Sequence, residues 1–280
     1  MQSPITPQTA VATLVDFWLE QLRAEQRLDG TTVNEYERVL HKLVIPATGA
    51  VRLCDLTTIK IDKMLTVLGS QSLNRQRKAK VVLGAMLDTA VQVGAVPVNP
   101  VRGALSISRP APDHRSLTMD EVECVRAAVR AWLNKERSGP KSSGDIADII
   151  EVMLGTGARI GEVLALRWAD IDLKARVVEV NATIKTETGI GTYRKALVRP
   201  RLVSVPEGAA LILQARRRTS RDNFLDALFP TRNITWQQVN NVERRWRQIR
   251  REAGLEWVTL EAFRRSSREQ EPSRPKLPEC

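Results

Sequence analysis

An arginine set in a glycine turn is the part of this sequence best suited to chemistry. Arg159 lies in the segment GTGARIGEVLALRW, residues 155–168, between two apolar stretches that indicate helices. It would therefore lie where the second helix begins. Free N–H groups at a helix start and a rigid two-pronged guanidinium together predict a grip on a phosphate. Glu162 could brace Arg159 from the same helix face. The alternative is a solvated arginine with an ordinary surface ion pair.

Two later segments carry further cationic side chains. One is YRKALVRPRLVSVP, residues 193–206, an expected hairpin and strand with Lys195 near its start. The other is VTLEAFRRS, residues 258–266, with Arg264 near its end. Together with the arginine turn, in this order along the chain, these segments resemble the phage integrase family of tyrosine recombinases.

The resemblance implies a site for phosphoryl transfer on DNA. Arg159 and Arg264 would offset the charge on the non-bridging oxygens of a scissile phosphate. Lys195, on a mobile hairpin tip, would protonate the departing 5′ oxygen, with Lys185 and Arg194 as nearby competitors. The family chemistry needs no metal and no cofactor.

Two positions depart from the family pattern. Glu261 falls where the family usually has a histidine, and a carboxylate repels a phosphate unless it is protonated or turned away. The family's nucleophilic tyrosine, which follows the second arginine box, has no counterpart. The sequence contains 2 tyrosines, Tyr36 in an expected bundle helix and Tyr193 in the hairpin.

Three functions are open on this basis. The first is a site-specific recombinase, or integrase, for phage DNA whose C-terminus is lost by truncation or frameshift and which cannot cleave alone. The second is an integrase-derived DNA-binding or regulatory protein without catalysis. The third, ranked last, is a helical transcription regulator, which would need a helix-turn-helix and no lysine hairpin.

The charge of the chain favours a polyanionic partner. The net charge is +11 and arginines are concentrated in the last quarter of the sequence. We expect double-stranded DNA at attachment or core sites as the partner, together with other integrase protomers. The predicted DNA contacts, for which a solvated basic face is the alternative, are Arg75, Arg77, Lys78, Lys80 and Arg265.

The remaining composition excludes several classes of protein. The 3 cysteines are far apart and only 2 histidines are present, so neither a disulfide framework nor a zinc site is expected. No signal peptide and no membrane-length apolar stretch is visible. These features predict a protein of the bacterial cytoplasm that does not enter the membrane.

The expected fold is mainly α with a small antiparallel sheet, an α+β protein. Apolar residues at helical spacing predict four bundle helices in the first hundred residues, with a capping box at Thr32 and Glu35. A second capping box at Thr118 opens a new helical region. β-branched residues then predict strands over 177–184 and 202–205.

The resemblance and the composition together predict the domains. Residues 8–104 would form a helical core-binding domain, after a tail over 1–7. Residues 117–266 would form a catalytic domain, incomplete at its C-terminus, and 105–116 a linker. The polar, proline-rich residues 267–280 predict a disordered tail. The two domains would clamp a duplex between them.

Overall fold

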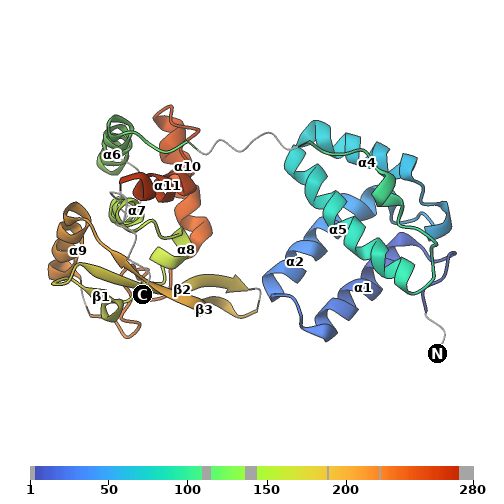
Figure 1. Ribbon diagram of the computed structural model, residues 1–280, viewed down its shortest axis with the longest axis horizontal. Helices are drawn as coiled ribbons and strands as arrows, with labels where there is room; N and C mark the ends of the chain where they lie inside the picture. The colour runs from blue at the N-terminus through green and yellow to red at the C-terminus, as the bar shows by residue number, and fades with distance from the viewer. Residues whose placement is uncertain (1–3, 109–114, 136–143, 188, 221, 271–280) are drawn as a thin grey trace, which may run out of the picture. The chain divides into compact units, whose positions relative to one another are not determined.

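The computed structural model describes residues 4–108, 115–135, 144–187, 189–220 and 222–270 (Figure 1). The chain divides into two compact units, Met1–Ala111 (unit 1) and Pro112–Cys280 (unit 2), and each has its own hydrophobic core. The described helices are all too short or too polar to cross a membrane. The expected class, mainly helical with a small antiparallel sheet, is confirmed.

Unit 1 is built from helices alone within its described residues (Figure 1). Its elements are α1 (Val11–Glu25), α2 (Gly30–Val39), the π-helical turn η1 (Leu40–Val44), α3 (Ile45–Thr48), the 3-10 turn η2 (Leu53–Asp55), α4 (Thr58–Gln71), α5 (Leu73–Gln92) and the 3-10 turn η3 (Pro100–Gly103). The four long helices are those that the apolar spacing predicts.

The start of α2 differs from the prediction. Asp29 caps this helix by accepting a hydrogen bond from the Thr31 N–H at 3.1 Å, so Thr32 lies inside the helix. Aspartate caps a helix as well as threonine does, and here it comes earlier in the chain. Further along α2, Tyr36 stacks on Trp18 of α1 with ring centroids 5.7 Å apart. Tyr36 therefore packs in the bundle.

The described residues of the predicted tail over 1–7 contact the helical bundle. Ile5 is buried in the core of unit 1, and the Pro7 carbonyl accepts a hydrogen bond from the Cys54 N–H at 2.9 Å. An apolar side chain and a backbone contact thus hold these residues on the bundle. Residues 1–3 lie outside the described part of the chain.

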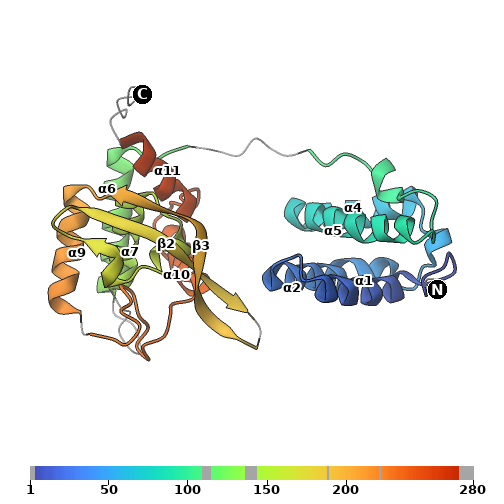
Figure 2. The ribbon, with the colours of Figure 1, turned by 60° about the horizontal axis from the view of Figure 1, so that its bottom comes forward.

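Unit 2 combines helices with the sheet (Figure 2). Its elements are α6 (Met119–Asn134), α7 (Asp145–Thr156), α8 (Ile160–Val163), the 3-10 turn η4 (Trp168–Asp170), β1 (Ile171–Asp172), β2 (Val177–Glu187), β3 (Gly191–Ser204), α9 (Glu207–Thr219), α10 (Val239–Glu252) and α11 (Leu260–Gln270). Thr118 and Glu121 form the predicted capping box at the start of α6.

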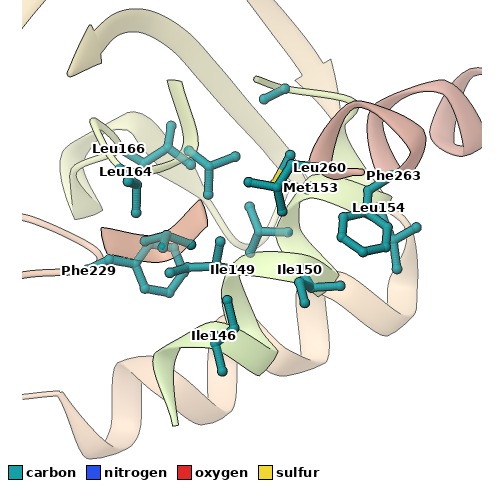
Figure 3. Packing of buried hydrophobic residues seen from close by; sticks show 14 of the residues in the cluster. Ile146, Ile149, Ile150, Met153, Leu154, Leu164, Leu166, Phe229, Leu260 and Phe263 are labelled. Atoms are coloured by element: carbon teal, nitrogen blue, oxygen red, sulfur yellow. The ribbon is translucent and has the colours of Figure 1, made fainter. Parts of the chain in front are cut away.

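The central helix of unit 2 is α7, which contacts α6, α8, α9, α10 and α11. Figure 3 shows apolar side chains of α7 packed with others from distant segments: Ile146, Ile149, Ile150, Met153, Leu154, Leu164, Leu166, Phe229, Leu260 and Phe263. Gly157 follows α7 with a φ of 61°, a left-handed conformation that favours glycine. This residue turns the chain toward Arg159.

The sheet has three antiparallel strands in the order β1-β2-β3. Apolar and polar residues alternate along β2, and the apolar face is buried. The last strand is much longer than the predicted strand over 202–205, because its pairing with β2 continues back to Gly191. Lys195 pairs with Thr183 inside this ladder, so the expectation that it lies at a hairpin tip is wrong. The β2–β3 hairpin projects beyond the helices of its own unit (Figure 2).

The first residues of the predicted disordered tail are helical. Of the tail over 267–280, the residues up to Gln270 belong to α11, because buried Ser266 anchors the helix by accepting a hydrogen bond from the Leu117 N–H at 2.8 Å. The rest of that tail lies outside the described residues.

The predicted linker over 105–116 begins on the surface of unit 1. The Lys80 ammonium donates hydrogen bonds to the carbonyls of Ala104 and Leu105, at 3.0 and 2.7 Å. These contacts hold the start of the linker against α5. Residues 109–114 of the linker lie outside the described part of the chain.

Candidate phosphate-binding site

Arg159 lies at the N-terminal end of α8, in the turn that follows α7. Its side chain is 60 % exposed, and its Nη1 lies 3.3 Å from Glu162 Oε1. The predicted second helix is only the 4 residues of α8, and Glu162 Oε2 already accepts the Arg159 N–H at 2.8 Å. A single turn supplies little dipole. The guanidinium is therefore the group that can serve a phosphate here.

Glu162 is not part of an ordinary surface ion pair, because its side chain is 3 % exposed. The carboxylate also accepts hydrogen bonds from Arg201, at 2.6 Å from Nη2 and 3.4 Å from Nη1. Burial raises the pKa of Glu162, but the hydrogen bonds from Arg201 and Arg159 outweigh it and hold the pKa below its usual value. Sequence reasoning missed Arg201, because no local pattern links two residues 39 positions apart.

The second arginine of the family pattern, Arg264, lies on α11. Its side chain is 14 % exposed, and its Nη1 donates a hydrogen bond to Glu261 Oε1 at 2.7 Å. Its buried Nε has no partner among the described residues. The sequence predicts that the Glu261 carboxylate repels a phosphate. The ion pair with Arg264 offsets its negative charge and so reduces this repulsion.

Arg159 and Glu261 line one cavity of about 360 Å³, together with Arg247, Arg250 and Glu243 of α10. Three arginines and two glutamates are among the lining residues, so the lining is net positive and suits an anion. The sequence shows that this part of the chain is rich in arginine. Which of these arginines meet Arg159 depends on how α10 packs beside α11.

Lys195 lies on the same sheet face as Thr183, its partner across the strands. α8 packs closely on that residue, since a Cβ at Gly161 would lie 2.7 Å from Thr183 Oγ1. This approach brings α8 close to the position on β2 that pairs with Lys195, and the Lys195 side chain is exposed. Among the residues that the structure describes, Lys195 is not one that lines the cavity.

Arg194, a competitor of Lys195, has a structural role. Its Nε donates a hydrogen bond to the Ala165 carbonyl at 2.9 Å, and its Nη2 pairs with Asp170 at 3.1 Å. The guanidinium also donates to the Asn181 side chain. These contacts tie β3 to the segment after α8.

The cations predicted to contact DNA on α5 make contacts within unit 1. The hydrogen bonds are Arg75 to Gln71 at 3.1 Å, Arg77 to the Ser108 carbonyl at 2.8 Å, Lys78 to Glu35 at 2.5 Å, and Lys80 to the carbonyls named above. Hydrogen bonds from Arg38 and then Lys78 outweigh burial and lower the pKa of Glu35 to about 2. A phosphate would have to compete with these partners. Arg75, Arg77 and Lys80 give up less than Lys78, because their partners are neutral amides and the partner of Lys78 is a carboxylate.

Arg265 also contacts its own unit. Its Nη2 donates a hydrogen bond to the Arg115 carbonyl at 3.3 Å. The Arg115 guanidinium in turn lies 4.2 Å from the centre of the Trp257 ring and pairs with Glu121. Arg265 therefore helps to hold the start of unit 2 against α11.

One tyrosine belongs to the helical bundle of unit 1 and the other to the hairpin of unit 2. Tyr36 belongs to unit 1, and the Tyr193 hydroxyl donates a hydrogen bond to Glu187 at 2.5 Å near the end of the hairpin. Neither is among the described residues that line the cavity.

The sequence pattern of the phage integrase family matches residues 116–268. This segment is more than half of the chain and contains Arg159, Lys195, Glu261 and Arg264. The chain belongs to the phage integrase family. The family expected from the three sequence segments is thereby confirmed.

Curated relatives agree with this assignment. The integrase of Mycobacterium phage FRAT1 is 26 % identical over 232 residues, which are 79 % of this chain and 64 % of that protein. Tyrosine recombinase XerC of Proteus mirabilis is 25 % identical over 196 residues, 68 % of this chain and 61 % of that protein. The chain spans less than two thirds of the length of both relatives.

Solved integrases share the fold. The Tn1549 transposon integrase, in complex with circular intermediate DNA, superposes with a TM-score of 0.73 at 18 % identity, over 92 % of this chain and 85 % of that one. A lambda integrase dimer bound to a core site gives 0.69 at 15 % identity, over 93 % and 89 %. At these identities the likeness concerns the fold.

Proposed function

We propose that this chain is the DNA-binding and phosphate-binding part of a site-specific tyrosine recombinase, with double-stranded DNA as its substrate. The observation that carries the proposal is the cavity in which Arg159 lies with Arg247 and Arg250. The names of its relatives, integrase and tyrosine recombinase, support the proposal. The net charge of +11 supports a polyanionic partner.

Each family residue has a role in this proposal. Arg159 and Arg264 offset the charge that develops on the non-bridging oxygens of the phosphate. Lys195 gives a proton to the departing 5′ oxygen. Glu261 holds Arg264 by their ion pair. Arg75, Arg77, Lys78, Lys80 and Arg265 remain proposed contacts to the DNA backbone, and other protomers remain proposed partners, as in the lambda integrase dimer.

The test of phosphate binding is Arg159→Ala. A hydrogen bond to a charged group contributes about 1.5–3 kcal/mol, so we expect the affinity for a duplex to fall by about 10- to 150-fold. We expect the slope of log affinity against log salt to fall by about one, as for one lost phosphate contact. Fluorescence anisotropy with a labelled duplex, titrated at several salt concentrations, measures both quantities.

The matched control is Arg130→Ala, which removes the same charge from an exposed position on α6. Arg159→Lys is the second control, since it keeps the charge and loses the planar, two-pronged guanidinium. Equal losses for Arg159→Ala and Arg130→Ala would contradict the proposed site and leave only a general effect of charge.

We further propose that this chain does not form the phosphotyrosyl bond by itself. The basis is the position of its tyrosines: Tyr36 packs on Trp18 in unit 1, and the Tyr193 hydroxyl is held by Glu187. A nucleophile must lie in line with the phosphate to attack it. The alternative function, an integrase-derived protein that binds DNA without chemistry, differs only in whether a tyrosine supplied by another protomer restores cleavage.

Covalent capture tests this second proposal. Nicked duplexes drawn from a pool selected for binding to this chain trap a phosphotyrosyl product, which denaturing electrophoresis detects. We expect no adduct from this chain alone. An adduct that Tyr193→Phe abolishes would refute the proposal and identify Tyr193 as the nucleophile.

A further inference from the structure

One buried carboxylate is shared by two arginines at the candidate site. Glu162 accepts hydrogen bonds from Arg201 and from both the backbone and the side chain of Arg159. The side chain of Arg201 is 39 % exposed, and it reaches Glu162 from β3. Arg201 and Arg159 therefore compete for hydrogen bonds to the same carboxylate.

We propose that Arg201 is a positioning residue for Arg159: it occupies the Glu162 carboxylate, so that the Arg159 guanidinium stays available to a phosphate. This inference rests on the proposed function, in which Arg159 binds a DNA phosphate.

The distances show an uneven division of the carboxylate. Arg201 Nη2 lies 2.6 Å from Glu162 Oε2, whereas Arg159 Nη1 lies 3.3 Å from Oε1. Charge-assisted hydrogen bonds between nitrogen and a carboxylate are usually 2.7–2.9 Å long, so the contact to Arg159 is loose and the contact to Arg201 is close. Arg159 can turn toward a ligand at small cost, because Glu162 keeps its stronger partner.

Removal of Arg201 would change this balance. Burial opposes an uncompensated charge, so an ionised Glu162 without Arg201 must find its compensation in Arg159. The Arg159 side chain would then pair closely with the Glu162 carboxylate, and its guanidinium would no longer be available to a phosphate. The pKa of Glu162, which the hydrogen bonds from Arg201 and Arg159 hold low in spite of burial, indicates that the carboxylate is charged at neutral pH.

A bulge in the sheet brings Arg201 to this place. Ala182 pairs with Ala196, but Val180 pairs with Arg201, so the four residues 197–200 of β3 lie opposite Asn181 alone. Such a bulge redirects the side chains that follow it. The ion pair between Arg201 and Glu162 thereby ties α8 to the strand that carries Lys195, and it joins the two halves of the proposed site.

A double-mutant cycle between Arg201 and Arg159 tests the inference. We expect Arg201→Ala to lower the affinity for a duplex about fivefold in the parent chain, and to change it little in an Arg159→Ala background. We expect Arg201→Lys to recover most of the loss, because a lysine still compensates Glu162. Anisotropy measures the affinities, and circular dichroism confirms that each variant is folded.

A third substitution separates positioning from direct binding. Glu162→Gln removes the charge that would capture Arg159, and it keeps an oxygen for the Arg159 N–H. We therefore expect Glu162→Gln to raise the affinity of the Arg201→Ala variant. If Arg201→Ala does not fold, Arg201→Gln takes its place in the cycle, and Arg201→Lys remains the variant that retains the charge.

The outcomes distinguish the two proposals. Equal losses on Arg201→Ala in the presence and absence of Arg159 would overturn the inference, since Arg201 would then act on DNA by itself. An Arg159→Ala variant that binds DNA as the parent does would overturn the proposed function, and the inference with it.

Discussion

Phe263→Ala is expected to lower the free energy of unfolding of unit 2 by about 3–5 kcal/mol. Phe263 is fully buried on α11 and meets Trp246 of α10 edge to face, with ring centroids 5.1 Å apart. Its loss leaves a cavity between the two helices that line the proposed site. At about 2–4 °C for each kcal/mol, the melting temperature should fall by about 10 °C, which differential scanning calorimetry measures.

The matched control for this prediction is Phe224→Ala. Phe224 is 82 % exposed, so its removal opens no cavity, and a change within about 0.5 kcal/mol is expected. Because α11 also carries Glu261 and Arg264, the Phe263→Ala variant should lose affinity for DNA near its lowered melting temperature. Equal stabilities for the two variants would show that α11 is not packed as described.

The second large effect is expected from Arg216→Ala, at about 3–5 kcal/mol of stability. Arg216 is 14 % exposed and pairs with Asp145 and Asp148, both at 2.8 Å. Its Nε also donates a hydrogen bond to the Leu228 carbonyl at 2.9 Å, and its guanidinium lies over Phe229. Its removal leaves two carboxylates at the start of α7 without their cation. Chemical denaturation measures the loss.

The loss of stability caused by Arg216→Ala should depend on pH. Burial raises the pKa of Asp148 even though Arg216 donates a hydrogen bond to it, and loss of the arginine would raise it further. A raised pKa in the folded state means that the folded chain gains stability relative to the unfolded chain as the pH falls through that pKa. We therefore expect the difference between Arg216→Ala and the parent to shrink in acid. Arg218→Ala, exposed on the same helix, is the control and should be nearly neutral.

Local patterns predicted local geometry well. The glycine before Arg159 has the left-handed φ that ends α7, and the capping box at Thr118 starts α6. Both depend on neighbours within four positions of each other. The start of α2 differs from the prediction because Asp29 and Thr32 are both good capping residues, and the local sequence does not show which of them begins the helix.

The hairpin shows where local patterns stop. Its strand β3 is polar on much of its length, and its pairing depends on β2 across the turn rather than on its own residues. The position of Lys195 in the ladder therefore could not be derived from the spacing of apolar residues. The same holds for α11, whose last turns are polar and whose start is held by the buried residues that pack on α7.

By itself, the sequence determined the family, the α+β class, the arginine turn and the cationic character of the site, because each of these is written in residue types at short spacing. Only the tertiary structure decided which partner each cation takes. Arg159 and Arg201 share the Glu162 carboxylate. Arg194 binds the Ala165 carbonyl and so holds β3 to the segment after α8. The cations of α5 bind neutral oxygens and Glu35. A long charged side chain pairs with whichever acceptor the fold brings within reach, and that acceptor is often remote in sequence.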